Sequence, residues 1–131
     1  MIIADTSVWV EFLRNREPVH ARLKELLERG SVIGAECIFG ELLSGARSAR
    51  ETGLIESYWK SLPRIDETGI WMDAGRLSAS RGLHARGVGL VDAAALALAN
   101  RTGAEIWTLD RRLLDAAGEK SISPDRGGPR P

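Results

Sequence analysis

The amino-acid sequence predicts a single α/β domain with a central, mostly parallel sheet covered by helices on both faces. Short apolar segments alternate along the chain with longer segments in which apolar residues recur at helical spacing. Two of the apolar segments, at residues 2–4 and 106–109, each run directly into an aspartate. Parallel strands need long crossover connections, usually helices, so this alternation favours a parallel sheet.

The first half of the chain carries two expected strands and four expected helices. The helices are marked by apolar residues three or four positions apart, and capping residues, proline or glycine mark their ends. In order, we expect a strand at 2–4, a helix capped by Thr6 or Ser7, a helix between Pro18 and Gly30, a strand at 31–34, and helices over 35–46 and 48–61.

The second half repeats the alternation. We expect a short strand at 64–68, a helix over 70–86 closed by Gly87, a helix over 91–101 closed by Gly103, a strand at 106–109 and a short helix over 111–117. The Gly, Pro, Ser and Arg content after residue 117 is typical of a loose tail. The prediction is therefore one domain over residues 1–117 followed by a flexible tail over residues 118–131.

Composition limits the kind of protein this is. The 131 residues suit one domain, and 44% of them are hydrophobic, which is enough for a core. The longest apolar stretch, residues 91–99, is far shorter than the roughly 18 residues of a membrane span, and no leader segment is visible. The single Cys37 cannot form an internal disulfide. We expect a soluble, cytoplasmic protein without a membrane partner.

Net charge gives no support to nucleic-acid binding, because 18 basic and 18 acidic residues cancel. An anionic substrate would therefore have to be held locally. Of the basic residues, 15 are Arg and 3 are Lys. Arginine grips phosphate with a planar, bidentate fork, but a codon bias explains the same excess equally well.

Two acidic residues are expected at the carboxyl edge of the sheet, where ligands of parallel α/β sheets bind. Asp5 follows the strand at 2–4 and Asp110 follows the strand at 106–109. Each also has a structural interpretation. Asp5 suits a helix N-cap, and Asp110 is followed by Arg111 and Arg112, with which it would form an ion pair.

Two further acids lie on predicted helices. At about 100° per residue, Glu41 falls off the apolar stripe of its helix and shares a side with Cys37 and Gly45. The alternative for Glu41 is an ordinary solvated surface residue. Asp92 stands at the start of an alanine-rich helix, where it serves either the helix dipole or a cation.

Several carboxylates in one cleft would repel one another and raise one another's pKa unless a cation lies among them. Oxygen ligands without His or Cys select a hard ion such as Mg²⁺ or Mn²⁺ rather than zinc. Such an ion activates water for in-line attack on a phosphodiester and stabilises the leaving oxygen. The acids Asp5, Glu41, Asp92 and Asp110 therefore predict a metal-dependent nuclease.

Four segments resemble PIN-domain proteins, specifically toxins of the VapC type, in order and spacing. They are IIADTSVWVEFLR at 2–14, GELLSGAR at 40–47, VDAAALA at 91–97 and TLDR at 108–111. The resemblance covers residues 1–117. It implies that Asp5, Glu41, Asp92 and Asp110 are the family's catalytic acids, that Asp5 and Asp92 bind the metal directly, and that Ser7 helps arrange the site.

The same resemblance implies a compact α/β/α sandwich and an endoribonuclease acting on tRNA or ribosomal RNA. It also implies a cognate antitoxin partner and a homodimer. The closing strand of the family is here either absent or shortened to Ser121-Ile122-Ser123.

The alternative is a non-catalytic PIN-like module that binds RNA or protein, since acids also persist as helix caps and ion pairs. The arginines that would grip RNA phosphates, unless they are solvated helix faces, are Arg47, Arg50, Arg81, Arg86, Arg111 and Arg112.

Overall fold

A parallel sheet lies at the centre of the computed structural model, which describes residues 1–118 and 121–122. Its strands are β1 (Ile2–Ala4), β2 (Glu105–Trp107) and β3 (Ser121–Ile122), in the order β1-β2-β3. In the register of β1 and β2, Ile3 lies opposite Ile106 and Ala4 opposite Trp107, so the two strands end level with each other. The predicted α/β class with a parallel sheet is confirmed.

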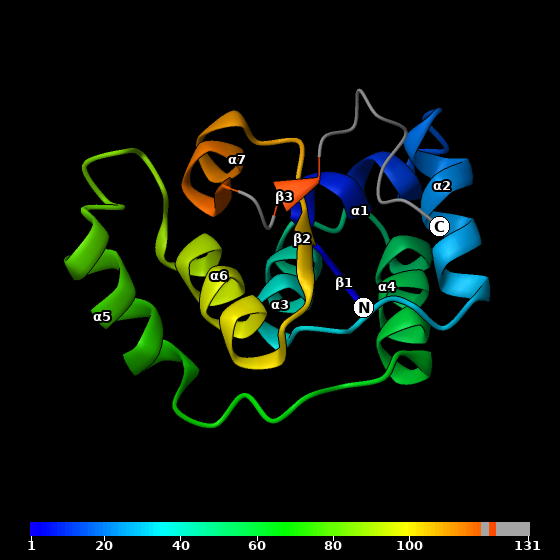
Figure 1. Cartoon of the computed structure of the whole chain (residues 1–131). Coiled ribbons are helices and arrows are strands. Elements are labelled where there is room, and N and C mark those ends of the chain that lie inside the picture. Colours follow the sequence, from blue (N-terminus) through cyan, green and yellow to red (C-terminus); the bar gives the residue numbers. More distant parts are fainter. Residues whose placement is uncertain (119–120, 123–131) are drawn as a thin grey trace.

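Helices lie on both sides of this sheet, with α5 and α6 on one side and α2 and α4 on the other (Figure 1). Within the described residues they are α1 (Thr6–Leu13), α2 (Val19–Glu28), α3 (Glu36–Ser44), α4 (Ala49–Ser61), α5 (Ile70–Arg81), α6 (Leu90–Thr102) and α7 (Arg111–Ala117). Each predicted helix is present, and α7 covers the predicted residues.

Three helix ends differ most from the prediction. Helix α3 ends at Ser44 rather than at residue 46, with Gly45 as its C-cap. The cap of α1 is Asp5 rather than Thr6 or Ser7, because the Asp5 carboxylate accepts the free N–H groups at the start of the helix. Helix α5 stops at Arg81 instead of reaching residue 86. Gly82, with φ +61°, takes the left-handed conformation that ends helices, and turns follow it to Gly87.

The predicted strands at 31–34 and 64–68 are each reduced to isolated bridges. Val32 pairs with Ile2, and Gly34 pairs with Arg64, both in parallel. These bridges extend the sheet beyond β1. On the other edge, the short closing strand exists as β3, which covers Ser121 and Ile122, whereas the predicted third residue, Ser123, lies outside the described residues. Most of the predicted tail, residues 118–131, also lies outside them.

The core fixes the helices that carry the acids. Trp9 of α1 contacts the rings of Phe12, Phe39 and Tyr58, which joins α1 to α3 and α4. Helix α6 is buried along residues 93–99, five of which are alanines, so neighbouring elements approach it closely. No helix in the described part of the chain is long and apolar enough to cross a membrane.

Candidate active site

Asp5 and Asp110 meet at the carboxyl edge of β1 and β2. The backbone N–H of Asp5 donates to the carbonyl of Trp107 at 3.0 Å, so the chain beyond β1 stays paired with the chain beyond β2. Asp5 is only 5% exposed, which makes it one of the few buried polar residues of the described chain. The geometry of the parallel sheet therefore brings these two distant segments together.

The Asp5 carboxylate is held by hydrogen bonds on both oxygens. Oδ1 accepts from the Ser7 N–H at 2.9 Å, from the Val8 N–H at 3.4 Å and from the Ser7 hydroxyl. Oδ2 accepts from the Thr108 hydroxyl. Burial raises the pKa of Asp5, and these hydrogen bonds act in the opposite direction. They therefore fix the orientation of a carboxylate that lies almost entirely out of solvent.

Two hydroxyls connect Asp5 to the segment that carries Asp110. Besides donating to Asp5, Ser7 Oγ accepts from the Leu109 N–H at 3.0 Å. Thr108 Oγ1 in turn accepts from the Asp110 N–H at 3.0 Å. The sequence analysis assigned a supporting role to Ser7 and missed Thr108. The available signal was a polar residue inside an otherwise apolar predicted strand at 106–109.

Asp110 caps α7 with one oxygen only. Its Oδ1 accepts from the Arg112 N–H at 2.8 Å and from the Leu113 N–H at 3.4 Å. Across residues 1–118, Asp110 makes no ion pair with Arg111 or Arg112, so the structural ion bridge considered from the sequence is not formed. The second oxygen, Oδ2, has no hydrogen bond to the described protein atoms and is free for another partner.

Glu41 reaches the site from α3. The Thr6 hydroxyl at the start of α1 donates to Glu41 Oε1, which joins this acid to the helix that Asp5 caps. The Glu41 side chain is exposed, and a Cβ built on the adjacent Gly40 would meet nothing within 4 Å. Thr6 is a second contact that the sequence analysis did not assign. A ligand therefore has open access to Glu41.

Asp92 is the acid with the most perturbed environment. It lies half-buried in the first turn of α6, where the N-cap residue, Gly89, has no capping side chain. The Asp92 carboxylate has no hydrogen bond or ion pair to the described residues. Burial, followed by the charges of Asp5, Asp110 and Glu41, raises the pKa of Asp92 to about 6. The other three predicted acids therefore lie close enough to Asp92 for their charges to act on it.

These donors fit a hard divalent cation. The cluster consists of carboxylates alone. The nearest thiol, Cys37, has its pKa raised to about 12, chiefly by burial, so it stays neutral. Among residues 1–118 and 121–122, no three Asp, Glu, His or Cys side chains are already arranged around one ion position. The argument for a divalent cation therefore rests on the repulsion between the Asp92 carboxylate and the other three carboxylates, which a cation would relieve.

The raised pKa of Asp92 predicts a pH-dependent stability. Its protonated form is favoured in the folded chain, so without a cation the melting temperature should fall as pH rises from about 4 through 6. Adding Mg²⁺ should raise the melting temperature more at pH 7 than at pH 5, because the ion competes with the proton. Thermal scans of wild type and Asp92→Asn check this, and the variant should show the flatter profile. Identical profiles would contradict it.

A groove of about 560 Å³ adjoins the acids along α3. Glu36, Gly40, Glu41 and Ser44 form one wall, and residues at the starts of α5 and α6, including Trp71 and Val91, also line it. Of the four acids Glu41 alone lines this groove, and the lining residue Val91 directly precedes Asp92 in the chain. An extended ligand has room to lie there.

Comparisons with known proteins show which family and fold this chain shares. Ribonuclease VapC32 of Mycobacterium tuberculosis is 34% identical over 125 residues, which cover 94% of this chain and 95% of the relative. The chain also resembles a toxin-antitoxin complex from Klebsiella pneumoniae (TM-score 0.67, 18% identity, 95% of this chain and 98% of that one).

A second solved structure, PAE2754 from Pyrobaculum aerophilum, has the same fold, with a TM-score of 0.63, 16% identity and coverage of 95% of this chain and 91% of that one. The PIN domain family profile matches residues 2–119, which include all four acids as well as Ser7 and Thr108. The chain therefore belongs to the PIN domain family.

Proposed function

We propose that this protein is a Mg²⁺- or Mn²⁺-dependent endoribonuclease and the toxin of a toxin–antitoxin pair. The observation that carries the proposal is the convergence of Asp5, Glu41, Asp92 and Asp110, each of the other three raising the pKa of Asp92. The name of the Mycobacterium relative, a VapC ribonuclease, supports RNA as the substrate.

In this proposal Asp5 and Asp92 hold the ion. When bound, the ion polarises the scissile phosphodiester and makes water a better nucleophile at neutral pH. Ser7 and Thr108 would fix the orientation of the Asp5 carboxylate as a ligand for such an ion. Glu41 Oε2 and Asp110 Oδ2 have no hydrogen bond within the described chain. We assign them to accept the proton of the attacking water and to complete the negative pocket.

The alternative function is that of a non-catalytic module that binds RNA or protein. Asp5 and Asp110 both serve as helix N-caps, and capping alone would account for their presence. Asp92 distinguishes the nuclease from the non-catalytic module, because its carboxylate makes no capping contact and yet the charges of three other acids act on it. A module that only bound RNA or protein would gain nothing from that repulsion. The nuclease is therefore the better explanation.

The proposed partners are an RNA substrate, a cognate antitoxin and a second copy of the chain. Arg111 and Arg112 are exposed beside Asp110 and make no ion pair within the described residues, so they are available to RNA phosphates. Trp71 and Met72 on α5 are 49% and 64% exposed, which favours a protein contact there. Light scattering after gel filtration tests the homodimer, and a monomeric mass at micromolar concentration would reject it.

Cleavage of purified tRNA and ribosomal RNA tests the proposed function. We expect discrete fragments with Mg²⁺ or Mn²⁺ and none with EDTA, because four carboxylates without an ion supply neither charge neutralisation nor an activated water. Asp5→Asn, which keeps the shape of the side chain but not its charge, should produce no fragments under any condition. Fragments formed equally well with EDTA would reject the metal dependence, and tight RNA binding without cleavage would reject the nuclease.

A further inference from the structure

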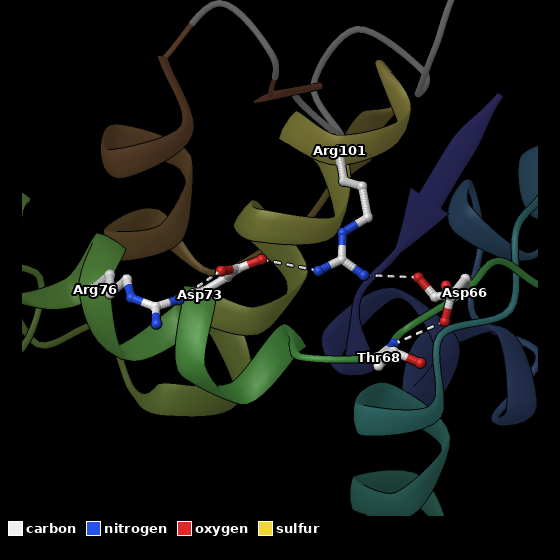
Figure 2. Close-up of polar contacts among 5 residues, drawn as sticks. All are labelled: Asp66, Thr68, Asp73, Arg76 and Arg101. Atoms are coloured by element: carbon white, nitrogen blue, oxygen red, sulfur yellow. Dashed lines mark hydrogen bonds and ion pairs between the residues drawn. The ribbon is translucent and has the colours of Figure 1, made fainter.

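The connection between α4 and α5 is tied to α6 by one arginine. Arg101, near the end of α6, donates from Nη1 to the backbone carbonyl of Asp66 at 2.7 Å and from Nη2 to Asp73 Oδ2 at 2.8 Å (Figure 2). Asp66 belongs to the connection and Asp73 to α5. One guanidinium therefore anchors the connection to both helices that follow it.

Further polar contacts stiffen this anchor. Asp73 also pairs with Arg76 at 3.0 Å, and the Thr68 N–H donates to Asp66 Oδ1 at 2.9 Å, closing a turn around residue 67 (Figure 2). The hydrogen bond from Arg101 is the largest of the effects that lower the pKa of Asp73. The segment on either side of Glu67 is thus held in place, which limits where the Glu67 side chain can reach.

The Glu67 side chain caps the start of another helix, α3. Its Oε2 accepts the backbone N–H of Glu36, the first residue of α3, at 2.7 Å. The N-cap residue of α3 itself is Ala35, which has no side-chain acceptor for the free N–H groups of the first turn. Glu67, although distant in sequence, therefore takes the N-capping role that Ser, Asp or Asn has at the start of other helices.

The same helix carries Glu41 to the active site. Glu36, Glu41 and Glu67 all line the groove along α3. Glu41 is otherwise held only by the Thr6 hydroxyl among the described residues. Fixing the first turn of α3 thus limits how far Glu41 can shift relative to Asp92 on α6, the helix to which Arg101 belongs.

We propose that Glu67 is a positioning residue for Glu41: it caps α3 from a segment that Arg101 holds against α6, and so sets the Glu41–Asp92 arrangement. This inference rests on the proposed function, because it assigns Glu67 a part in the same acidic site. Glu67 itself touches no reacting atom in this account.

A different account would assign Glu67 a role through its negative charge in the groove. Two substitutions of Glu67 distinguish the positioning role from the charge role. Glu67→Gln keeps the length and an acceptor oxygen but removes the charge, whereas Glu67→Asp keeps the charge but is one methylene too short. Because Arg101 holds the neighbouring backbone, the segment cannot simply move to compensate. Glu56→Gln is the control, since it removes an exposed carboxylate from α4 that lies outside the groove and makes no hydrogen bond within the described chain.

The experiment measures kcat and KM for RNA cleavage and the affinity for Mn²⁺ by calorimetry, each well below the melting temperature of the variant. We expect Glu67→Asp to lose about tenfold in kcat with KM little changed, because a small displacement of a reacting group is costly. Glu67→Gln and Glu56→Gln should stay within about threefold of wild type. A purely structural cap would lower the melting temperature and leave kcat and the Mn²⁺ affinity unchanged.

The outcomes distinguish this proposal from the proposed function. Active wild type with an equally active Glu67→Asp overturns the positioning role alone. An impaired Glu67→Gln variant beside an active Glu67→Asp variant replaces it with the charge account. Wild-type protein that neither cleaves RNA nor binds Mn²⁺ overturns the proposed function itself.

Discussion

Replacing Asp92 with asparagine is expected to slow RNA cleavage by about a thousandfold or more, because losing a charge that holds a catalytic ion costs several kcal/mol of barrier. The Asp92 carboxylate has no hydrogen bond in the described chain, and asparagine has nearly the same shape. The folded structure should therefore persist. Initial rates of cleavage under saturating Mg²⁺, with circular dichroism as the check on folding, measure both.

The control for Asp92→Asn is Glu56→Gln, which removes an exposed carboxylate from α4, a helix that carries none of the four acids. It should cleave at the wild-type rate. In metal-free buffer at pH 7, Asp92→Asn should also melt at a higher temperature than wild type, because the repulsion that raises the pKa of Asp92 is gone. Full activity in Asp92→Asn would remove this residue from the mechanism.

Replacing Thr108 with valine is expected to lower the free energy of unfolding by about 1–3 kcal/mol, the usual cost of leaving a buried polar group without its partner. Thr108 is fully buried, donates to Asp5 Oδ2 and accepts from the Asp110 N–H. Valine fills the same volume and does neither. Because Asp5 then loses part of its orientation, cleavage should slow by at least about tenfold.

Urea unfolding and cleavage rates test Thr108→Val, with Thr108→Ser as the control. Serine keeps the hydroxyl and gives up one methyl group, so it should recover most of the activity but not all of the packing. If Thr108→Val retained wild-type activity and stability, the hydrogen bonds of Thr108 to Asp5 and Asp110 would be incidental to the site.

The fold was largely predictable because local signals agree with the tertiary structure. Capping and apolar spacing placed α4 and α7 well, and glycine marked the end of α6. Helix α5 was predicted too long because Gly87 was taken as the residue that closes it, whereas Gly82, with φ +61°, ends the helix. Gly87 also has a positive φ, so both glycines suit a helix end and only the tertiary structure shows which one forms it.

The strands were predicted less well, because pairing depends on distant partners. Residues 31–34 and 64–68 have strand character but form only isolated bridges, and β2 stops at Trp107 rather than Leu109. There the Thr108 side chain turns to Asp5 and bonds the backbone of Asp110. The demands of the site, not the propensity of the segment, end this strand.

The four proposed acids could be named from the sequence, but, apart from Ser7, the residues that contact or position them could not. Motif and position identified the four carboxylates and Ser7, which the fold brings together. Thr6, Thr108 and Glu67 act across 35, 103 and 31 residues of chain. Such pairs leave no trace in local spacing, and only the tertiary structure shows them.

Anomalous diffraction from crystals of the wild-type protein soaked in Mn²⁺ tests the central claim most directly. We expect a peak between the Asp5 and Asp92 carboxylates at oxygen-ligand distances, and no such peak in Asp92→Asn crystals treated in the same way. The absence of a wild-type peak at saturating Mn²⁺, or a peak remote from these four acids, would contradict the account of this site as a metal-dependent nuclease centre.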